Sequence, residues 1–78
     1  MVLGKNYARY ERSQNAHQRL FEKHVNGRTN KDKVKALYHA TVQRNQRVDG
    51  MRVFSRTEKR ALFKDAQKRV AAGRYPFK

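Results

Sequence analysis

The chain of 78 residues has no cysteine, no tryptophan and a single proline. Without cysteine it forms neither disulfides nor zinc sites built on Cys ligands, which excludes a disulfide-stapled secreted mini-protein. No apolar run approaches the roughly 18 residues of a membrane helix, and residues 1–10 lack the apolar stretch of a secretory signal. The sequence therefore predicts an intracellular protein, cytoplasmic or in an organelle matrix, that does not insert into membranes.

Acidic residues are scarce: six Asp and Glu accompany twenty Lys and Arg, for a formal net charge of +14. Isoleucine is absent, and Leu, Val and Phe together supply only about 19% of the chain, which is close to the composition of disordered proteins. A core in a chain of this length contributes no more than about 3–5 kcal/mol, and the surplus positive charges repel one another. We therefore expect a negatively charged partner to complete the fold.

Three segments have apolar residues at the spacing of amphipathic helices. They lie at about residues 6–25, 31–47 and 56–72, and a short tail follows at 74–78. Helices of this length joined by short turns predict one all-α domain over residues 1–78, either a small three-helix bundle or an open three-helix arrangement.

Capping patterns mark the expected helix boundaries. Gly27, at positive φ, is expected to stop the first helix, and either Thr29 or Asn30 is expected to cap the second. Ser55 and Glu58 have the spacing of a capping box, in which each side chain bonds the backbone N–H of the other residue. This pattern predicts where the third helix begins.

The third segment carries a row of basic residues spaced by four. On an ideal helix they fall within about 120° of one another, beside the apolar stripe. The row consists of Arg56, Arg60, Lys64 and Lys68, with Lys59 next to it. Like charges at this spacing cost about 0.2–0.5 kcal/mol per pair, and in this helix only Asp65 with Arg69 opposes the repulsion. A polyanion along the row would remove this cost, so we predict phosphate contacts here.

Two further sets of residues suit nucleic-acid binding. Around the second connector, arginines surround Asp49 as the one acid and suit phosphate or base-edge contacts; they are Arg44, Arg47 and Arg52. Near the N-terminus, aromatic and arginine residues alternate as they do in arms that stack on bases, although aromatics at this spacing also pack in cores. This set is Tyr7, Arg9, Tyr10 and Arg12.

The aromatic residues of the tail, Tyr75 and Phe77, also lie among basic residues and have two possible roles. They either anchor in a groove of a partner or fold over the protein's own helices.

The sequence contains no constellation of catalytic residues and no Gly-rich phosphate loop. His17 and His24 share a face of the first helix, and His39 is expected on the polar side of the second. Two histidines without a third ligand are weak support for a metal site, and so short a chain has little volume for a ligand pocket. We therefore expect no enzyme activity, no metal, no cofactor and no small-molecule substrate.

The tripeptide Leu37-Tyr38-His39 is similar to the Leu-Tyr-Arg signature of small three-helix mitochondrial accessory proteins, a family that engages an acidic acyl carrier protein. The similarity covers two of three residues and lies in the second helix, whereas the family has it near the start of the first, so no membership is assigned. In size and charge the chain also resembles small ribosomal proteins, whose folds are completed by the RNA they bind.

These patterns favour a non-enzymatic RNA-binding protein, with a component of a large ribonucleoprotein such as a ribosome as the leading case. One alternative is a small DNA-binding regulator of phage or plasmid type. The connector at residues 48–55 is longer than the three or four residues of a helix-turn-helix turn, which ranks this alternative second. The other alternative is an inhibitor, assembly factor or subunit that docks on an acidic protein.

Overall fold

The computed structural model describes residues 4–77, which form three α-helices and no strand. Helix α1 spans Gly4–His24, α2 spans Asn30–Val48 and α3 spans Arg56–Ala71. The predicted all-α fold is confirmed, and each helix boundary lies within two residues of its expected position. Residues 1–3 of the N-terminal segment and Lys78 of the predicted tail lie outside the described residues. None of the three helices within residues 4–77 is both long and apolar enough to cross a lipid bilayer.

Local hydrogen bonds set the start of α2 and α3. The Thr29 hydroxyl accepts from the backbone N–H of Asp32 at 3.1 Å, which caps α2. Ser55 and Glu58 form the predicted capping box before α3. The Glu58 N–H donates to the Ser55 hydroxyl at 3.2 Å, and the Ser55 N–H donates to the Glu58 carboxylate at 2.9 Å.

Gly27 has a different role from the one expected. The backbone φ of Gly27 is not positive, so the prediction of a left-handed helix stop at this position is wrong. A Cβ at position 27 would lie only 2.3 Å from Oδ2 of Asp32. Glycine is required because the α1–α2 loop passes directly against the Asp32 side chain, which bonds His24 and Thr29.

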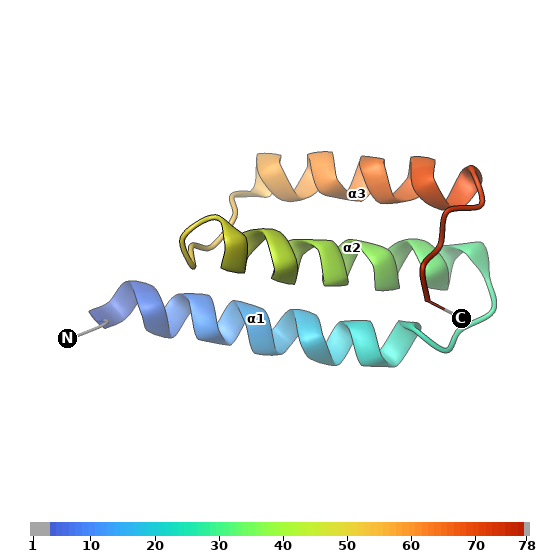
Figure 1. Ribbon diagram of the computed structural model, residues 1–78. Coiled ribbons are helices and arrows are strands. Elements are labelled where there is room, and N and C mark those ends of the chain that lie inside the picture. The colour runs from blue at the N-terminus through green and yellow to red at the C-terminus, as the bar shows by residue number, and fades with distance from the viewer. Residues whose placement is uncertain (1–3, 78) are drawn as a thin grey trace.

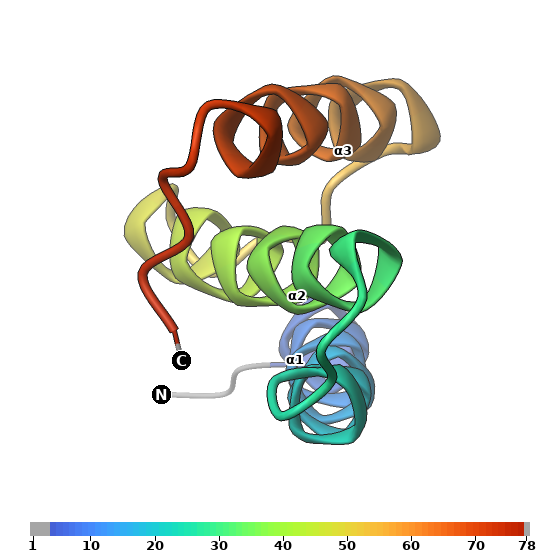
Figure 2. The ribbon, with the colours of Figure 1, turned by 90° about the vertical axis from the view of Figure 1, so that its right-hand side faces the viewer.

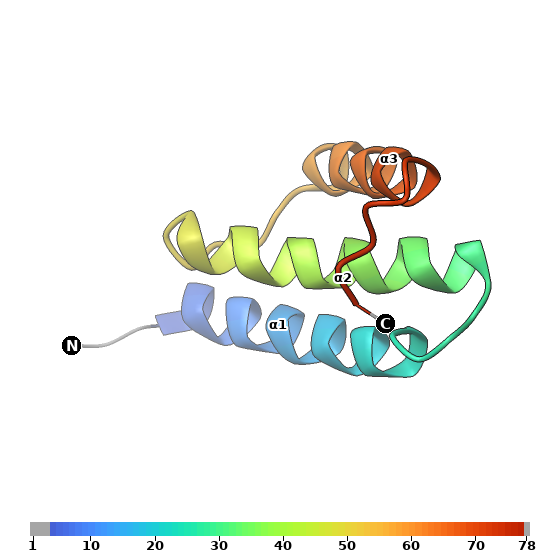
Figure 3. The ribbon, with the colours of Figure 1, turned by 45° about the vertical axis from the view of Figure 1, so that its right-hand side comes forward.

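Helix α2 lies in the centre of the molecule (Figures 1 and 2). It packs against α1 and against α3, whereas the described α1 and α3 make no backbone contact with each other. Figure 3 shows that α3 is inclined to α2, with α1 on the other side of α2. The result is an elongated, open three-helix arrangement of 43 × 22 × 17 Å.

The core around α2 is small and contains polar side chains. The buried apolar residues are Tyr10, Ala36, Leu37, Val42 and Ala66. The buried polar residues are His17, His39 and Gln46. The prediction that His39 lies on a polar face is wrong, because α2 is covered on two sides and His39 faces α1, where it bonds His17.

Gln46 is fully buried and connects three segments of the chain. Its amide nitrogen donates to Ser13 Oγ at 3.2 Å and to Gln14 Oε1 at 2.9 Å, both on α1. Its amide oxygen accepts from the backbone N–H of Phe54, in the α2–α3 connector, at 3.0 Å. Because the buried amide has partners for both its nitrogen and its oxygen, it fixes the connector and α1 relative to α2.

The last described residues fold back from the end of α3 across α2 towards α1 (Figure 2). The Tyr75 hydroxyl donates to the carbonyl oxygen of Val25 at 3.2 Å. The rings of Phe77 and Phe21 meet edge to face, with centroids 4.9 Å apart. Of the two roles considered for these tail aromatics, the structure shows the one in which they cover the protein's own helices.

Candidate nucleic-acid interface

The predicted row of basic residues lies along one exposed flank of α3. Arg56, Arg60, Lys64 and Lys68 are all exposed, and Lys59 beside them is half-buried. Arg56, Arg60, Lys64 and Lys68 follow one another by about one helical turn each, so the row extends over about 18 Å at 1.5 Å per residue. These five side chains are called the α3 row below, and they are the largest set of predicted contacts that the structure keeps on one element.

Both acidic residues of α3 pair with arginines outside the α3 row. Glu58 accepts two hydrogen bonds from the Arg52 guanidinium, and Asp65 pairs with Arg69 at 3.0 Å. On an ideal helix Asp65 and Arg69 lie across the apolar stripe from Arg60. Within residues 4–77 no ion pair involves a lysine or arginine of the α3 row, so no carboxylate offsets the positive charge of the row.

An open hollow between α2 and α3 lies beside this row and is lined by aromatic rings. Tyr38 of α2 and Phe63 of α3 meet edge to face, with centroids 5.3 Å apart and ring planes at 76°. Arg56, Lys59 and Arg60 complete the lining. The hollow has a volume of about 440 Å³ and is open to solvent. We call this surface the basic hollow.

Aromatic contacts continue from the basic hollow to α1. The His17 ring lies edge-on to Tyr38, with centroids 6.0 Å apart. His17 Nδ1 lies 2.8 Å from His39 Nδ1, so one imidazole donates to the other. Burial, with a smaller contribution from the positive charge of Lys59, lowers the pKa of both histidines to about 4. Both rings are neutral at pH 7, so lysine and arginine alone supply the charge of this region.

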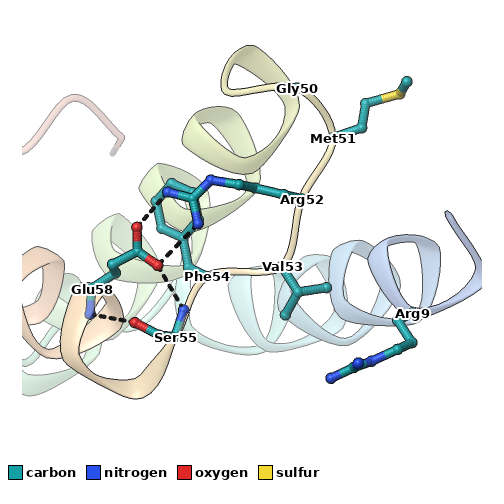
Figure 4. A pocket seen from close by; sticks show the side chains of 8 residues that line it. All are labelled: Arg9, Gly50, Met51, Arg52, Val53, Phe54, Ser55 and Glu58. Carbon is teal, nitrogen blue, oxygen red and sulfur yellow. Dashed lines mark hydrogen bonds and ion pairs between the residues drawn. The ribbon is translucent and has the colours of Figure 1, made fainter. Parts of the chain in front are cut away.

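Arg52, a predicted phosphate contact, lies in an intramolecular network (Figure 4). Its Nε is 2.6 Å from Asp49 Oδ2, its terminal nitrogens bond Glu58, and its guanidinium lies 4.6 Å from the Phe54 ring centroid. Hydrogen bonds from Arg52, and then from the Ser55 N–H, lower the pKa of Glu58 to about 2. The same carboxylates raise the pKa of Arg52, whose charge they offset.

The other two predicted arginines, Arg44 and Arg47, lie in the last turns of α2. Arg44 is exposed and lines a hollow together with Asp65 and Arg69, across the apolar stripe of α3 from the α3 row. Arg47 is exposed three residues further along α2, on the same side as Arg44. The structure therefore does not bring Arg44 and Arg47 into the basic hollow, and they remain separate predicted contacts.

The alternating aromatic and arginine residues near the N-terminus belong to α1. Tyr10 is only 7% exposed, and its ring lies 5.9 Å from that of the half-buried Tyr7. A ring so deeply buried has no free face for a base, so Tyr10 serves packing. Arg9 and Arg12 are exposed, and Arg9 lines a hollow beside the connector (Figure 4).

Comparison with protein-family models, with curated proteins and with solved structures finds no match. Within residues 4–77 there is also no group of three His, Cys, Asp or Glu side chains that is placed to hold a metal ion. The surface of α3 and the basic hollow is therefore the basis for assigning a function.

Tyr38 and Phe63 line this site but were not among the contacts predicted from the sequence. One signal for Phe63 is present in the sequence: Lys59 and Arg60 precede it by four and three residues and so share its side of a helix. No such signal places Tyr38 opposite Phe63, because the two residues come from different helices and only the packing of α2 on α3 joins them.

Proposed function

We propose that this protein is a non-enzymatic RNA-binding protein that serves as an accessory or structural component of a large ribonucleoprotein such as a ribosome. The observation that carries the proposal is the unpaired charge of the α3 row. Arg52 and Arg69 pair with the two acids of α3 and leave the row without a carboxylate partner in residues 4–77. Phosphates of a nucleic-acid backbone are the anions that match a row of this length and charge.

The basic hollow and the connector favour RNA over duplex DNA. Residues 49–55 separate α2 from α3 and exceed the three- or four-residue turn that positions a recognition helix in a major groove. The basic hollow sets aromatic rings beside the α3 row. RNA presents unpaired bases in loops and single strands, where aromatic side chains stack on them.

Salt titration of RNA binding tests the proposal. If the protein neutralises about six to eight phosphates, a plot of log Kobs against log salt falls with a slope of roughly −4 to −7, depending on strand type. Fluorescence anisotropy with a labelled RNA measures this slope. A flat salt response contradicts the proposal, and so does tighter binding of duplex DNA than of RNA.

A double substitution in the α3 row provides the second test. Arg60→Ala with Lys64→Ala should weaken binding to all RNA sequences about equally and make the slope shallower by about 1.4–1.8, because two phosphate contacts are lost. The matched control is Arg19→Ala with Lys23→Ala, which removes the same charge from exposed positions on α1. Equal losses in both variants would show that net charge alone binds RNA. Co-purification with one acidic protein after nuclease treatment, without RNA binding, would favour a protein partner instead.

A further inference from the structure

We infer that the basic hollow holds an unstacked base of a single RNA strand, whose phosphates lie on the α3 row. This inference rests on the proposed function and adds the form of nucleic acid that the protein selects. It predicts that the protein prefers a single strand with intact bases to a duplex, and to a strand of equal charge that lacks bases.

The two rings of the basic hollow form a corner. Because the planes of Tyr38 and Phe63 are at 76°, a flat base can stack on one ring while its edge meets the other. Within residues 4–77 the Tyr38 hydroxyl makes no hydrogen bond to protein, so it is available to a polar edge of the base. Burial raises the pKa of Tyr38, so this hydroxyl keeps its proton at pH 7.

Positive charge lines the α3 side of the corner. Arg56 and Arg60 are exposed members of the α3 row, and Lys59 lines the basic hollow and acts electrostatically on the neutral His17–His39 pair. A phosphate next to a base inserted in the hollow can therefore contact cations of α3. Base stacking on an aromatic ring also tolerates any sequence, because every base has a π face.

The other hollows of residues 4–77 are less suited to an anionic strand. The one beside the connector contains Glu58, and the one that Arg44 lines contains Asp65. The hollow at the α1–α2 loop also has aromatic rings and cations and no lining acid, but Lys33 already lies over the Tyr75 ring, 5.8 Å from its centroid. The Tyr75 hydroxyl is also already bonded to Val25. The basic hollow has aromatic rings and cations without a lining acid.

A duplex does not fit this arrangement, because its bases are stacked and paired. Extruding one base from a duplex costs a few kcal/mol, whereas a base in a single strand is already free to unstack. Alanine substitutions of stacking aromatics show that each stacked base contributes about 1–3 kcal/mol, which corresponds to about 5- to 150-fold in affinity.

Anisotropy with three labelled probes tests the inference: a 12-nucleotide oligouridylate, a ribose-phosphate strand of the same length without bases, and a 12-base-pair RNA duplex. We expect the intact strand to bind about 5- to 150-fold more tightly than the strand without bases. Phe63→Leu and Tyr38→Leu should each reduce this ratio towards one. Phe54→Leu, the same change in an aromatic outside the basic hollow, should leave the ratio unchanged.

The outcomes separate the two proposals. Equal binding of the intact and base-free strands with a steep salt dependence would overturn base capture and leave the RNA-binding proposal intact, as would tighter binding of the duplex. Failure of every probe to bind would overturn both. If the Leu variants unfold by circular dichroism, NMR of the unmodified protein decides: uridine monophosphate should shift the ring protons of Tyr38 and Phe63, and inorganic phosphate should not. Equal shifts with both probes would overturn base capture.

Discussion

At Gln46, one side-chain amide determines how α1, α2 and the connector meet. An apolar residue of similar size would fill the space but leave the Phe54 N–H without its acceptor. It would also leave Ser13 and Gln14 without their amide donor. A buried polar group without a partner costs about 1–3 kcal/mol, which is a large share of the stability of a chain this small.

Replacement of this amide should therefore be costly. Gln46→Leu should lower the free energy of unfolding by about 2–4 kcal/mol, measured by urea denaturation. Gln67→Leu, the same substitution at an exposed position of α3, should change it by less than about 0.5 kcal/mol. Similar effects of the two substitutions would show that the buried hydrogen bonds do not specify the packing.

The His17–His39 pair predicts a loss of stability in mild acid. Burial lowers both pKa values to about 4, and Lys59 from α3 together with Lys35 from α2 faces His39. As the pH falls below about 6.5, the unfolded chain takes up protons that the folded protein excludes. Stability should thus be full above pH 6.5 and decline between pH 6.5 and 4, by up to about 1.4 kcal/mol per pH unit for each histidine.

Urea midpoints at pH 7.5, 6 and 5 measure this decline, and NMR of the imidazole C–H signals measures the pKa values directly. A folded protein in which His17 and His39 both titrate near pH 6.5 would contradict the prediction. The pair itself was not predictable from the sequence, because His17 and His39 are 22 residues apart and meet only when α1 packs on α2.

The helices, in contrast, could be predicted from local signals. The capping box at Ser55 and the cap at Thr29 depend on residues three positions apart, and both are present. What the sequence did not show is that α2 has two covered sides. A single apolar stripe was expected, so His39, on the second covered side, was assigned to solvent.

The capping box gives a direct prediction for α3. Ser55→Ala removes the acceptor of the Glu58 N–H and should cost about 0.5–2 kcal/mol of stability. Thr57→Ala, within the first turn but outside the capping box, is the control and should have a smaller effect. Thermal unfolding followed by circular dichroism measures both, and equal shifts in Tm would contradict a capping role.

The C-terminal segment acts as a fourth packing element. Phe77→Ala removes the edge-to-face contact with Phe21 and should lower the free energy of unfolding by about 1–2 kcal/mol. Arg74→Ala, an exposed change in the same segment, should have little effect. Urea denaturation compares the two variants. If Phe77→Ala unfolds at the same midpoint as the unmodified protein, the fold-back does not stabilise the helices.

For the whole molecule, a net charge of +14 on a small polar core makes self-repulsion a major destabilising force. Raising NaCl from 20 to 500 mM should therefore increase Tm of the free protein. Relief of about 1 kcal/mol, the repulsion expected along the α3 row, corresponds to about 4–8 °C for a domain of this size. A scan in the two buffers measures the shift, and a Tm that falls with salt would contradict it.

The arrangement of acids has one more consequence. Asp65 and Arg69 lie on one flank of α3 beside Pro76 and Phe77, whereas the charged residues of the opposite flank are all basic. A strand that binds α3 therefore has one row of cations to lie on, because the other flank carries the negative charge of Asp65 and is covered by Pro76 and Phe77. The expected stoichiometry is one strand per molecule, even when RNA is in large excess.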